Sequence, residues 1–249
     1  MSVPLHERAD RTHAADVWRD GFARPRVFLQ PIAAPSILGL FGFCAATAMV
    51  GAYLAGWYGN AATPGYLFPF AAVFGGLAQL LAGMWAFRAR DGIATAMHGM
   101  WGSFWIAFGI LNWLVLDGKL LPIGKGEQPN TAIAFWFLML GAITLSGALA
   151  SLGENLGVAL VLWPLATASG IAAGAYWGGS HFWVVVSGWV FVGAAAAAWY
   201  VATGMMMASA SGRTILPLGA YRKAANVPGR RPIEAIELDW AEPGVKQGQ

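Results

Sequence analysis

The sequence predicts an all-α integral membrane protein with six transmembrane helices. Of its 249 residues, 57% are apolar and only 11% are charged, whereas soluble domains carry about 25% charged residues. The apolar residues gather in six runs of about 20 or more residues, the length at which a helix crosses the hydrocarbon core. None of these runs contains Asp, Glu, Lys or Arg. The pattern excludes a soluble domain.

The residues before the first apolar run form a polar segment, 1–33, with five arginines mixed among aspartate and glutamate. It has no apolar core of the kind that a secretory signal peptide needs, and its acidic residues argue against a transit peptide. We expect a cytoplasmic tail, with a short amphipathic helix around residues 17–27 lying on the membrane surface.

The six apolar runs are joined by short links, and we expect each run to form one transmembrane helix. Because the links are short, consecutive helices should run antiparallel as neighbours. The runs are approximately 35–57, 65–87, 92–116, 131–152, 155–177 and 182–208. They make residues 34–219 one membrane domain. The polar segment 220–249 is predicted to be a flexible cytoplasmic tail.

Lysine and arginine are distributed unevenly between the two sides of the predicted helices. Thirteen of the 15 lie in the two tails and the loop at 88–91, whereas the opposite side carries only Lys119 and Lys125. Since cytoplasmic loops are enriched in these residues, both termini are predicted to be cytoplasmic and the protein to lie in a cell (inner or plasma) membrane. This distribution accounts for the net charge of +3 without a nucleic-acid partner.

The third run contains Trp101-Gly102-Ser103-Phe104-Trp105, a pair of small residues between aromatic side chains. The small pair leaves space in which a neighbouring helix or a permeating molecule can approach the backbone. We interpret this helix as part of the wall of a narrow pathway. In the fifth run, glycines at every fourth position of residues 170–178 predict a close helix contact, within a protomer or between protomers.

Four polar side chains inside the runs are candidates for a substrate or proton site. Gln79 is costly to bury in lipid, so it should face a pore or hydrogen-bond to another helix. Thr47 and Ser103 offer hydroxyls to a substrate, although such residues often bond their own backbone carbonyls. His98 is, Cys44 aside, the only readily titratable side chain in the runs. It is a candidate for proton handling or gating, or else a packed histidine near the interface.

Sequence patterns of enzymes and metal sites are absent. The chain contains no HExxH, Walker loop or GxSxG pattern, and its single cysteine, Cys44, is interpreted as a small packing residue. Residues 205–207, three consecutive methionines, splay around a helix instead of converging, so neither a metal nor a cofactor is expected. A pathway without fixed charge suits a neutral species or a small anion that passes hydroxyls, amides and aromatic edges.

Four motifs occur in order along the chain. They are LGLFGF at 38–43, GGLAQ at 75–79 followed by Ala82-Gly83, GSFW at 102–105, and GRTILPLG at 212–219. With these motifs the chain resembles the acetate uptake transporter family, which contains the bacterial succinate–acetate permease and the yeast ammonia/acetate exporters. The resemblance extends from about Pro35 to Gly219.

The resemblance implies six helices per protomer, a homohexameric ring with a pathway through each protomer, and transport of acetate or related short carboxylates with a proton. It also implies a hydrophobic constriction of a Phe, a Tyr and a Leu, which correspond to Phe43, Trp101 and Leu165. Trp101 therefore removes a hydroxyl and adds bulk at the narrowest point. Two further departures are Ala34–Ile37, where the family has Asn-Pro-Ala-Pro, and Ala86, where it has a glutamate.

These observations together predict a lipid-embedded permease for small carboxylates such as acetate, taken up with a proton. The three constriction residues would desolvate the carboxylate, and Thr47, Gln79 and Ser103 would offset part of that penalty by hydrogen bonding. Two alternatives stay open. One is an uncoupled channel for a small neutral solute, such as ammonia or a protonated weak acid. The other is a structural membrane subunit that does not transport because Trp101 plugs it.

Overall fold

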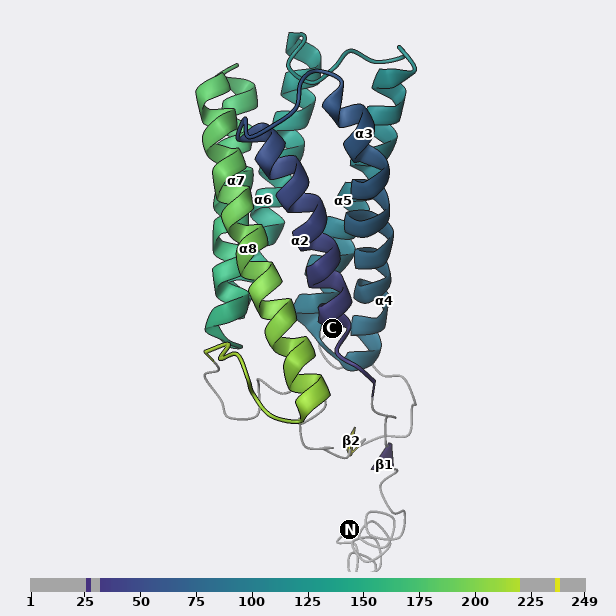
Figure 1. The fold of residues 1–249 in the computed structure, drawn as a ribbon, viewed down its shortest axis with the longest axis vertical. Helices are drawn as coiled ribbons and strands as arrows, with labels where there is room; N and C mark the ends of the chain where they lie inside the picture. Colours follow the sequence, from purple (N-terminus) through teal and green to yellow (C-terminus); the bar gives the residue numbers. More distant parts are fainter. Residues whose placement is uncertain (1–25, 28–31, 220–235, 238–249) are drawn as a thin grey trace, which may run out of the picture. The chain divides into compact units, whose positions relative to one another are not determined.

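A computed structural model describes residues 26–27, 32–219 and 236–237, and its main body is a bundle of six apolar spans (Figure 1). The second span is continuous but consists of three segments. The helices are α2 (Pro35–Leu54), α3 (Thr63–Phe70), η1 (Ala71–Ala78), α4 (Gln79–Ala89), α5 (Gly92–Leu116), α6 (Glu127–Ser151), α7 (Leu156–Trp177) and α8 (His181–Ser211). Each predicted run corresponds to one span, and the ends differ by a few residues. The prediction of six transmembrane helices is confirmed.

Apart from the bundle, two short strands pair with each other. Strand β1 (Arg26–Val27) runs antiparallel to β2 (Ile236–Glu237). The remainder of segment 220–249, and most of segment 1–33, lie outside the described residues. The surface helix expected around residues 17–27 also lies outside them, except for its last two positions, which form β1.

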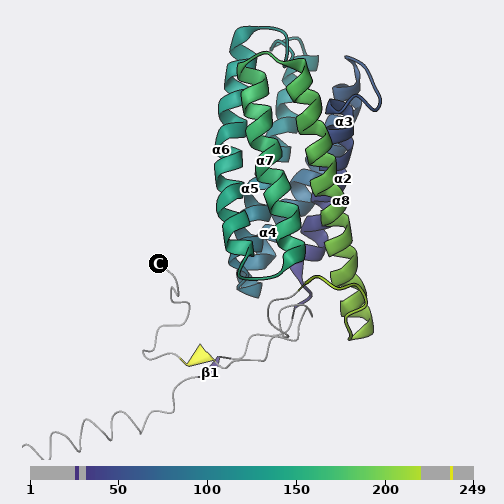
Figure 2. The ribbon, with the colours of Figure 1, turned by 90° about the vertical axis from the view of Figure 1, so that its left-hand side faces the viewer.

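The spans are arranged so that the first and the last are neighbours. α2 packs between α8 and the η1–α4 segment, α7 packs between α6 and α8, and α5 packs against η1 and α4. Figure 2 shows α6, α7 and α8 side by side. The backbones of α5 and α6 make few contacts. Aromatic side chains fill the space between these two helices. The centroid of the Phe104 ring of α5 lies 6.5 Å from that of Trp136, on which it stacks, and 5.9 Å from that of Phe137, both on α6.

Glycines bring the second and third spans into close contact. A Cβ placed on Gly102 would lie 2.6 Å from the backbone nitrogen of Leu80 and 3.0 Å from the Gly76 oxygen. The space beside Gly102 is therefore filled by the neighbouring helix, and the alternative that a permeating molecule uses it is wrong. By contrast, a Cβ on the exposed Gly170 or Gly174 would meet nothing within 4 Å. The missing side chains of Gly170 and Gly174 thus leave open space, although the Gly170 backbone nitrogen lies 3.5 Å from the position that a Cβ on Gly141 of α6 would take.

The middle of the second span is a π-helix, η1, which the sequence analysis did not anticipate. Such wide turns are rare and are often found at functional sites. Gly42 of α2 faces this segment, and a Cβ there would collide with the carbonyl oxygen of Phe74. The widened backbone is thus accommodated by a glycine on the adjacent helix, in the same region as the candidate site.

The GRTILPLG motif at 212–219 has a structural role. The backbone N–H of Leu156 donates to the Gly219 oxygen at 3.0 Å, and the N–H of Gly157 donates to the Leu218 oxygen at 2.9 Å. The Asn155 side chain accepts from the Val158 N–H at 2.9 Å. Together these bonds satisfy N–H groups of the first turn of α7, which have no partner inside the helix.

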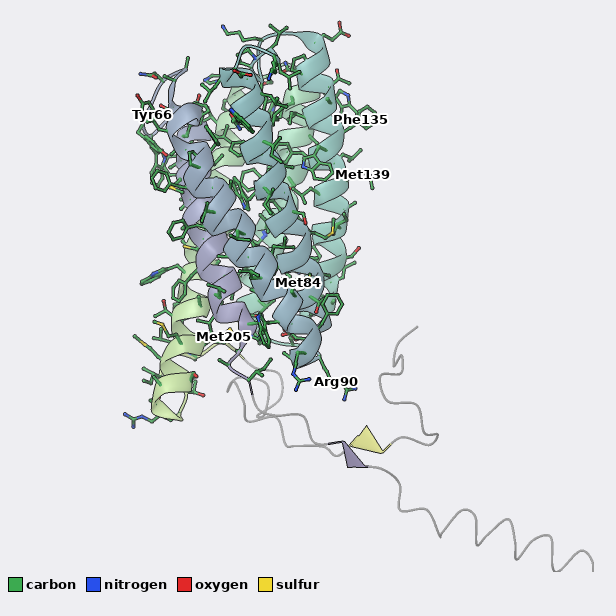
Figure 3. All side chains as sticks on the ribbon, turned by 90° about the vertical axis from the view of Figure 1, so that its right-hand side faces the viewer. Tyr66, Met84, Arg90, Phe135, Met139 and Met205 are labelled. Atoms are coloured by element: carbon green, nitrogen blue, oxygen red, sulfur yellow. The ribbon has the colours of Figure 1, made fainter. Side chains whose placement is uncertain are left out.

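The outer surface of the bundle is apolar. Phe135 and Met139 project outward from α6 (Figure 3) and are more than half exposed, as is Trp199 of α8. Trp163 of α7 is also more than one third exposed. An apolar belt on a bundle of this length is suited to a bilayer.

Candidate transport pathway

A cavity of about 640 Å³ enters the bundle from the end that carries the α5–α6 loop. We call it the vestibule. All six spans contribute to its wall, and exposed loop residues such as Gly59 and Lys125 form its mouth. Thr47, Trp101 and Trp105 line the part farthest from the helix ends at this side, and Gly51, Asn112 and Tyr176 line the part nearer the mouth. The cavity leads from solvent toward the centre of the bundle.

Trp101 lies at the deep end of the vestibule and is fixed in place. Its indole Nε1–H donates to the Thr144 hydroxyl oxygen at 3.0 Å, and that hydroxyl donates to the Leu140 carbonyl at 2.6 Å. The Trp101 ring makes edge-to-face contacts with Phe43 at 5.7 Å and with Phe104 at 5.3 Å. Only 2% of Trp101 is exposed. The ring therefore closes the vestibule.

The other two predicted constriction residues belong to the same buried cluster. Phe43 and Leu165 are both enclosed in the core that contains Trp101, and neither lines the vestibule. The predicted constriction is thus a packed layer at this level, with open space on one side of it.

Two polar side chains of the vestibule wall have no partner. Thr47 is 2% exposed and Trp105 is 3% exposed, and neither the Thr47 hydroxyl nor the Trp105 indole N–H makes a hydrogen bond. Unpaired buried donors are uncommon because each costs about 1–3 kcal/mol. Trp105 was not among the predicted binding residues, since a tryptophan in an apolar run is equally suited to packing. Its unpaired N–H was visible only in the structure.

Gln79 and His98 are also buried without partners, but they do not line the vestibule. The Gln79 side-chain oxygen and the His98 Nδ1 make no hydrogen bond. The His98 ring packs against Gly39, and the Gln79 backbone nitrogen faces Gly42. His98 precedes Trp101 by three residues on α5, about 4.5 Å along the axis toward the Arg90 end. The two side chains therefore lie at the level of the constriction or beyond it.

Ser103 does not belong to this site, and its predicted role is wrong. The side chain is exposed on the outer face of α5, and its hydroxyl donates to the Gly99 carbonyl at 2.8 Å. Ser103 lies on a different face of the helix from Trp101 and Trp105, which line the vestibule. The hydroxyl satisfies its own helix instead of a substrate.

Asn112 and Tyr58 are further residues of the vestibule wall. Asn112 is buried, and its amide donates to the Phe108 carbonyl at 2.8 Å. The Tyr58 hydroxyl donates to the Met49 carbonyl at 2.8 Å. Burial raises the pKa of Tyr58, so its hydroxyl remains a neutral donor at physiological pH.

The described residues contain no group of three or more His, Cys, Asp or Glu side chains arranged to hold a metal ion. What the bundle offers is an open vestibule, a closed aromatic layer and a few neutral hydrogen-bonding groups. Six apolar spans around such a path define a multi-pass membrane protein of the transport class.

The comparison with known sequences gives the family. The sequence profile of the GPR1/FUN34/yaaH family matches residues 23–218, and the chain belongs to this family. The succinate-acetate/proton symporter SatP of Escherichia coli (strain K12) is 27% identical over 189 residues, which cover 76% of this chain and 96% of that protein. An uncharacterized protein of Methanothermobacter thermautotrophicus is 27% identical over 194 residues, 77% of this chain and 93% of that protein.

A solved structure shares the fold. The structure of the bacterial acetate channel SatP aligns with a TM-score of 0.68 at 23% sequence identity, covering 76% of this chain and 99% of that chain. The family resemblance drawn from the four motifs is confirmed. The relatives that carry functional names are a symporter and a channel rather than enzymes.

Proposed function

We propose that this protein is a membrane permease for acetate and related small carboxylates. Family membership supports the substrate class, since the symporter among its relatives is named for succinate and acetate. The observation that carries the proposal is the vestibule, which descends to Trp101 and is lined by Thr47 and Trp105, two residues whose buried donors have no partner. Two neutral donors beside an apolar constriction are suited to a small carboxylate.

The path begins in the vestibule and crosses the constriction. A carboxylate at the floor accepts hydrogen bonds from the Thr47 hydroxyl and the Trp105 indole. It is then desolvated as it passes the layer of Phe43, Trp101 and Leu165, which must open. The buried side chain of Gln79 donates from its amide NH2 group to the carboxylate beyond that layer. Neutral donors hold an anion weakly enough for it to leave, as conduction requires.

The transport mode we propose is proton-coupled uptake, with His98 as the residue that handles the proton. His98 is buried and its Nδ1 has no partner, so it can gain a proton without breaking a bond that the structure shows. Passive conduction is the second candidate, because one relative is named a proton symporter and the solved neighbour a channel.

The proposed orientation places both termini in the cytoplasm. The described ends of the bundle differ in charge, with Arg88, Arg90 and Arg213 at one end and Lys119 and Lys125 at the other. Together with the cationic tails, this pattern satisfies the positive-inside rule. Figure 3 shows Arg90 and Tyr66 at opposite ends of the second span.

We also propose a homo-oligomer, with a hexamer as the state implied by the family resemblance. The exposed Gly170 and Gly174 of α7 have open space beside them and suit close packing of a second protomer in the membrane. Cross-linking in membranes, followed by sizing of the products, tests the number of protomers.

Reconstitution into liposomes tests the function. Labelled acetate should enter protein-containing vesicles faster than empty ones. With an imposed pH gradient, coupled uptake concentrates the label inside, whereas a channel only equilibrates it. No uptake of acetate, propionate or succinate above that of empty vesicles would contradict the permease and favour a structural subunit.

A further inference from the structure

We propose that Lys125, at the mouth of the vestibule, collects the carboxylate anion before it reaches the constriction. This inference rests on the proposed function and deepens it. It predicts that the species entering the vestibule is the carboxylate anion, and not the protonated acid or ammonia. It also makes Lys125 a residue that sets the apparent affinity for substrate.

The two lysines at this end of the bundle differ in their surroundings. The Lys119 ammonium lies 2.7 Å from Oδ2 of Asp117, and neither residue lines the vestibule. Lys125 does line it, and forms no ion pair with any residue that the structure describes. The charge of Lys119 is compensated locally, whereas the charge of Lys125 is available to a ligand.

The other groups of the wall do not cancel this charge. Among the described residues that line the vestibule there is no aspartate or glutamate, and Lys125 is the only lysine or arginine. His181, at the start of α8, is the one other titratable nitrogen of the wall. Glu127 follows Lys125 by two residues, but it is exposed to solvent and is not part of the wall.

The shape of the site strengthens the effect of the charge. Most of the wall is apolar, with residues such as Leu54, Leu116 and Ile133, so it screens a charge less than open water does. An ammonium in such a cavity raises the local concentration of a carboxylate. At the floor, the hydroxyl of Thr47 and the indole N–H of Trp105, which have no partner, then donate hydrogen bonds to the arriving anion. The Lys125 ammonium at the mouth and the Thr47 and Trp105 donors at the floor therefore lie along one route for the anion.

The test compares Lys125→Gln with Lys119→Gln in right-side-out membrane vesicles that contain the full chain. At low ionic strength and neutral pH, Lys125→Gln should raise the KM for acetate uptake about 3- to 10-fold and leave kcat within about twofold. The increase should shrink at high salt, because salt screens the interaction. Lys119→Gln should change KM by less than about twofold, and Lys125→Arg should behave like the wild type.

Each outcome decides the inference. An unchanged KM in Lys125→Gln at low salt, or an equal change in Lys119→Gln, would overturn the role of Lys125 and leave the permease intact. A fall in kcat with an unchanged KM would also overturn it. Wild-type vesicles that take up no acetate would instead refute the proposed function, and the inference with it. Thermal unfolding of both glutamine variants controls for folding, which we expect to be unchanged because both lysines lie on the surface.

Discussion

At the scale of single residues, the Trp101–Thr144 hydrogen bond holds the ring that closes the vestibule. The smaller ring of Trp101→Phe lacks the N–H, while Thr144 keeps its bond to the Leu140 carbonyl. We expect this variant to raise the uptake of succinate relative to acetate, because the constriction becomes wider. Initial rates for the two labelled acids measure the ratio. Trp163→Phe, at an exposed position outside the vestibule, is the matched control and should leave the ratio unchanged.

The unpaired hydroxyl of Thr47 predicts opposite effects on stability and on transport. Thr47→Val keeps the shape and removes a buried donor that has no partner. The variant should be as stable as the wild type or more stable, by up to about 1–3 kcal/mol. Acetate uptake should fall about tenfold, since one hydrogen bond to a charged ligand is lost. Thermal unfolding and proteoliposome uptake measure the two effects.

Ser103→Ala is the control for the loss of a hydroxyl. Ser103 is exposed and its hydroxyl is bonded to the Gly99 carbonyl, so uptake should not change. A loss of stability in Thr47→Val without any loss of uptake would show that its hydroxyl serves packing instead of substrate.

Which residues face the pathway was difficult to predict from the sequence. In a membrane helix, the side that faces lipid is as apolar as the side that faces protein, so hydrophobicity does not fix the rotation of the helix. Ser103 was assigned to the pathway and lies outside it, whereas Asn112 was not among the candidate residues and lines the vestibule. The position of Trp101 at the constriction was inferred from the family motif beside it.

At the scale of elements, close packing of α5 against the second span depends on Gly102. Gly102→Ala places a Cβ 2.6 Å from the Leu80 nitrogen, and backbone cannot move aside as a side-chain end can. We expect a loss of about 1–3 kcal/mol in unfolding free energy. Gly99→Ala, three residues away on the same helix, meets nothing within 4 Å and should be neutral or stabilising. Thermal unfolding in detergent compares the two. Equal stabilities would contradict the packing described.

The existence of the elements was predictable, but the geometry of one of them was not. The bilayer imposes a length on every span, and that length is visible in the apolar runs. The π-helix η1 has the same apolar composition as its flanks, so composition carries no signal for it. Gly75-Gly76 and Gly42 were visible as motif glycines, but their role in accommodating the widened backbone required the structure.

At the scale of the whole molecule, the transport path depends on the packing of the first span, α2, against the last span, α8. The short links predicted that consecutive spans are neighbours. They could not predict that the first span, α2, packs against the last span, α8. The vestibule forms inside that arrangement, with walls from all six spans. Its position at the lysine-bearing end and its depth down to Trp101 could not be read from the sequence.

The central claim is that substrate passes through the vestibule of a single bundle. Cys44 is the only cysteine, so Cys44→Ser provides a background for Asn112→Cys in the vestibule and Ser103→Cys on the outer face of the same helix. A charged thiol reagent added from the Lys125 side should block acetate uptake by the Asn112→Cys protein, more slowly when acetate is present. It should leave the Ser103→Cys protein active. Full uptake by the Asn112→Cys protein after complete labelling would contradict the claim.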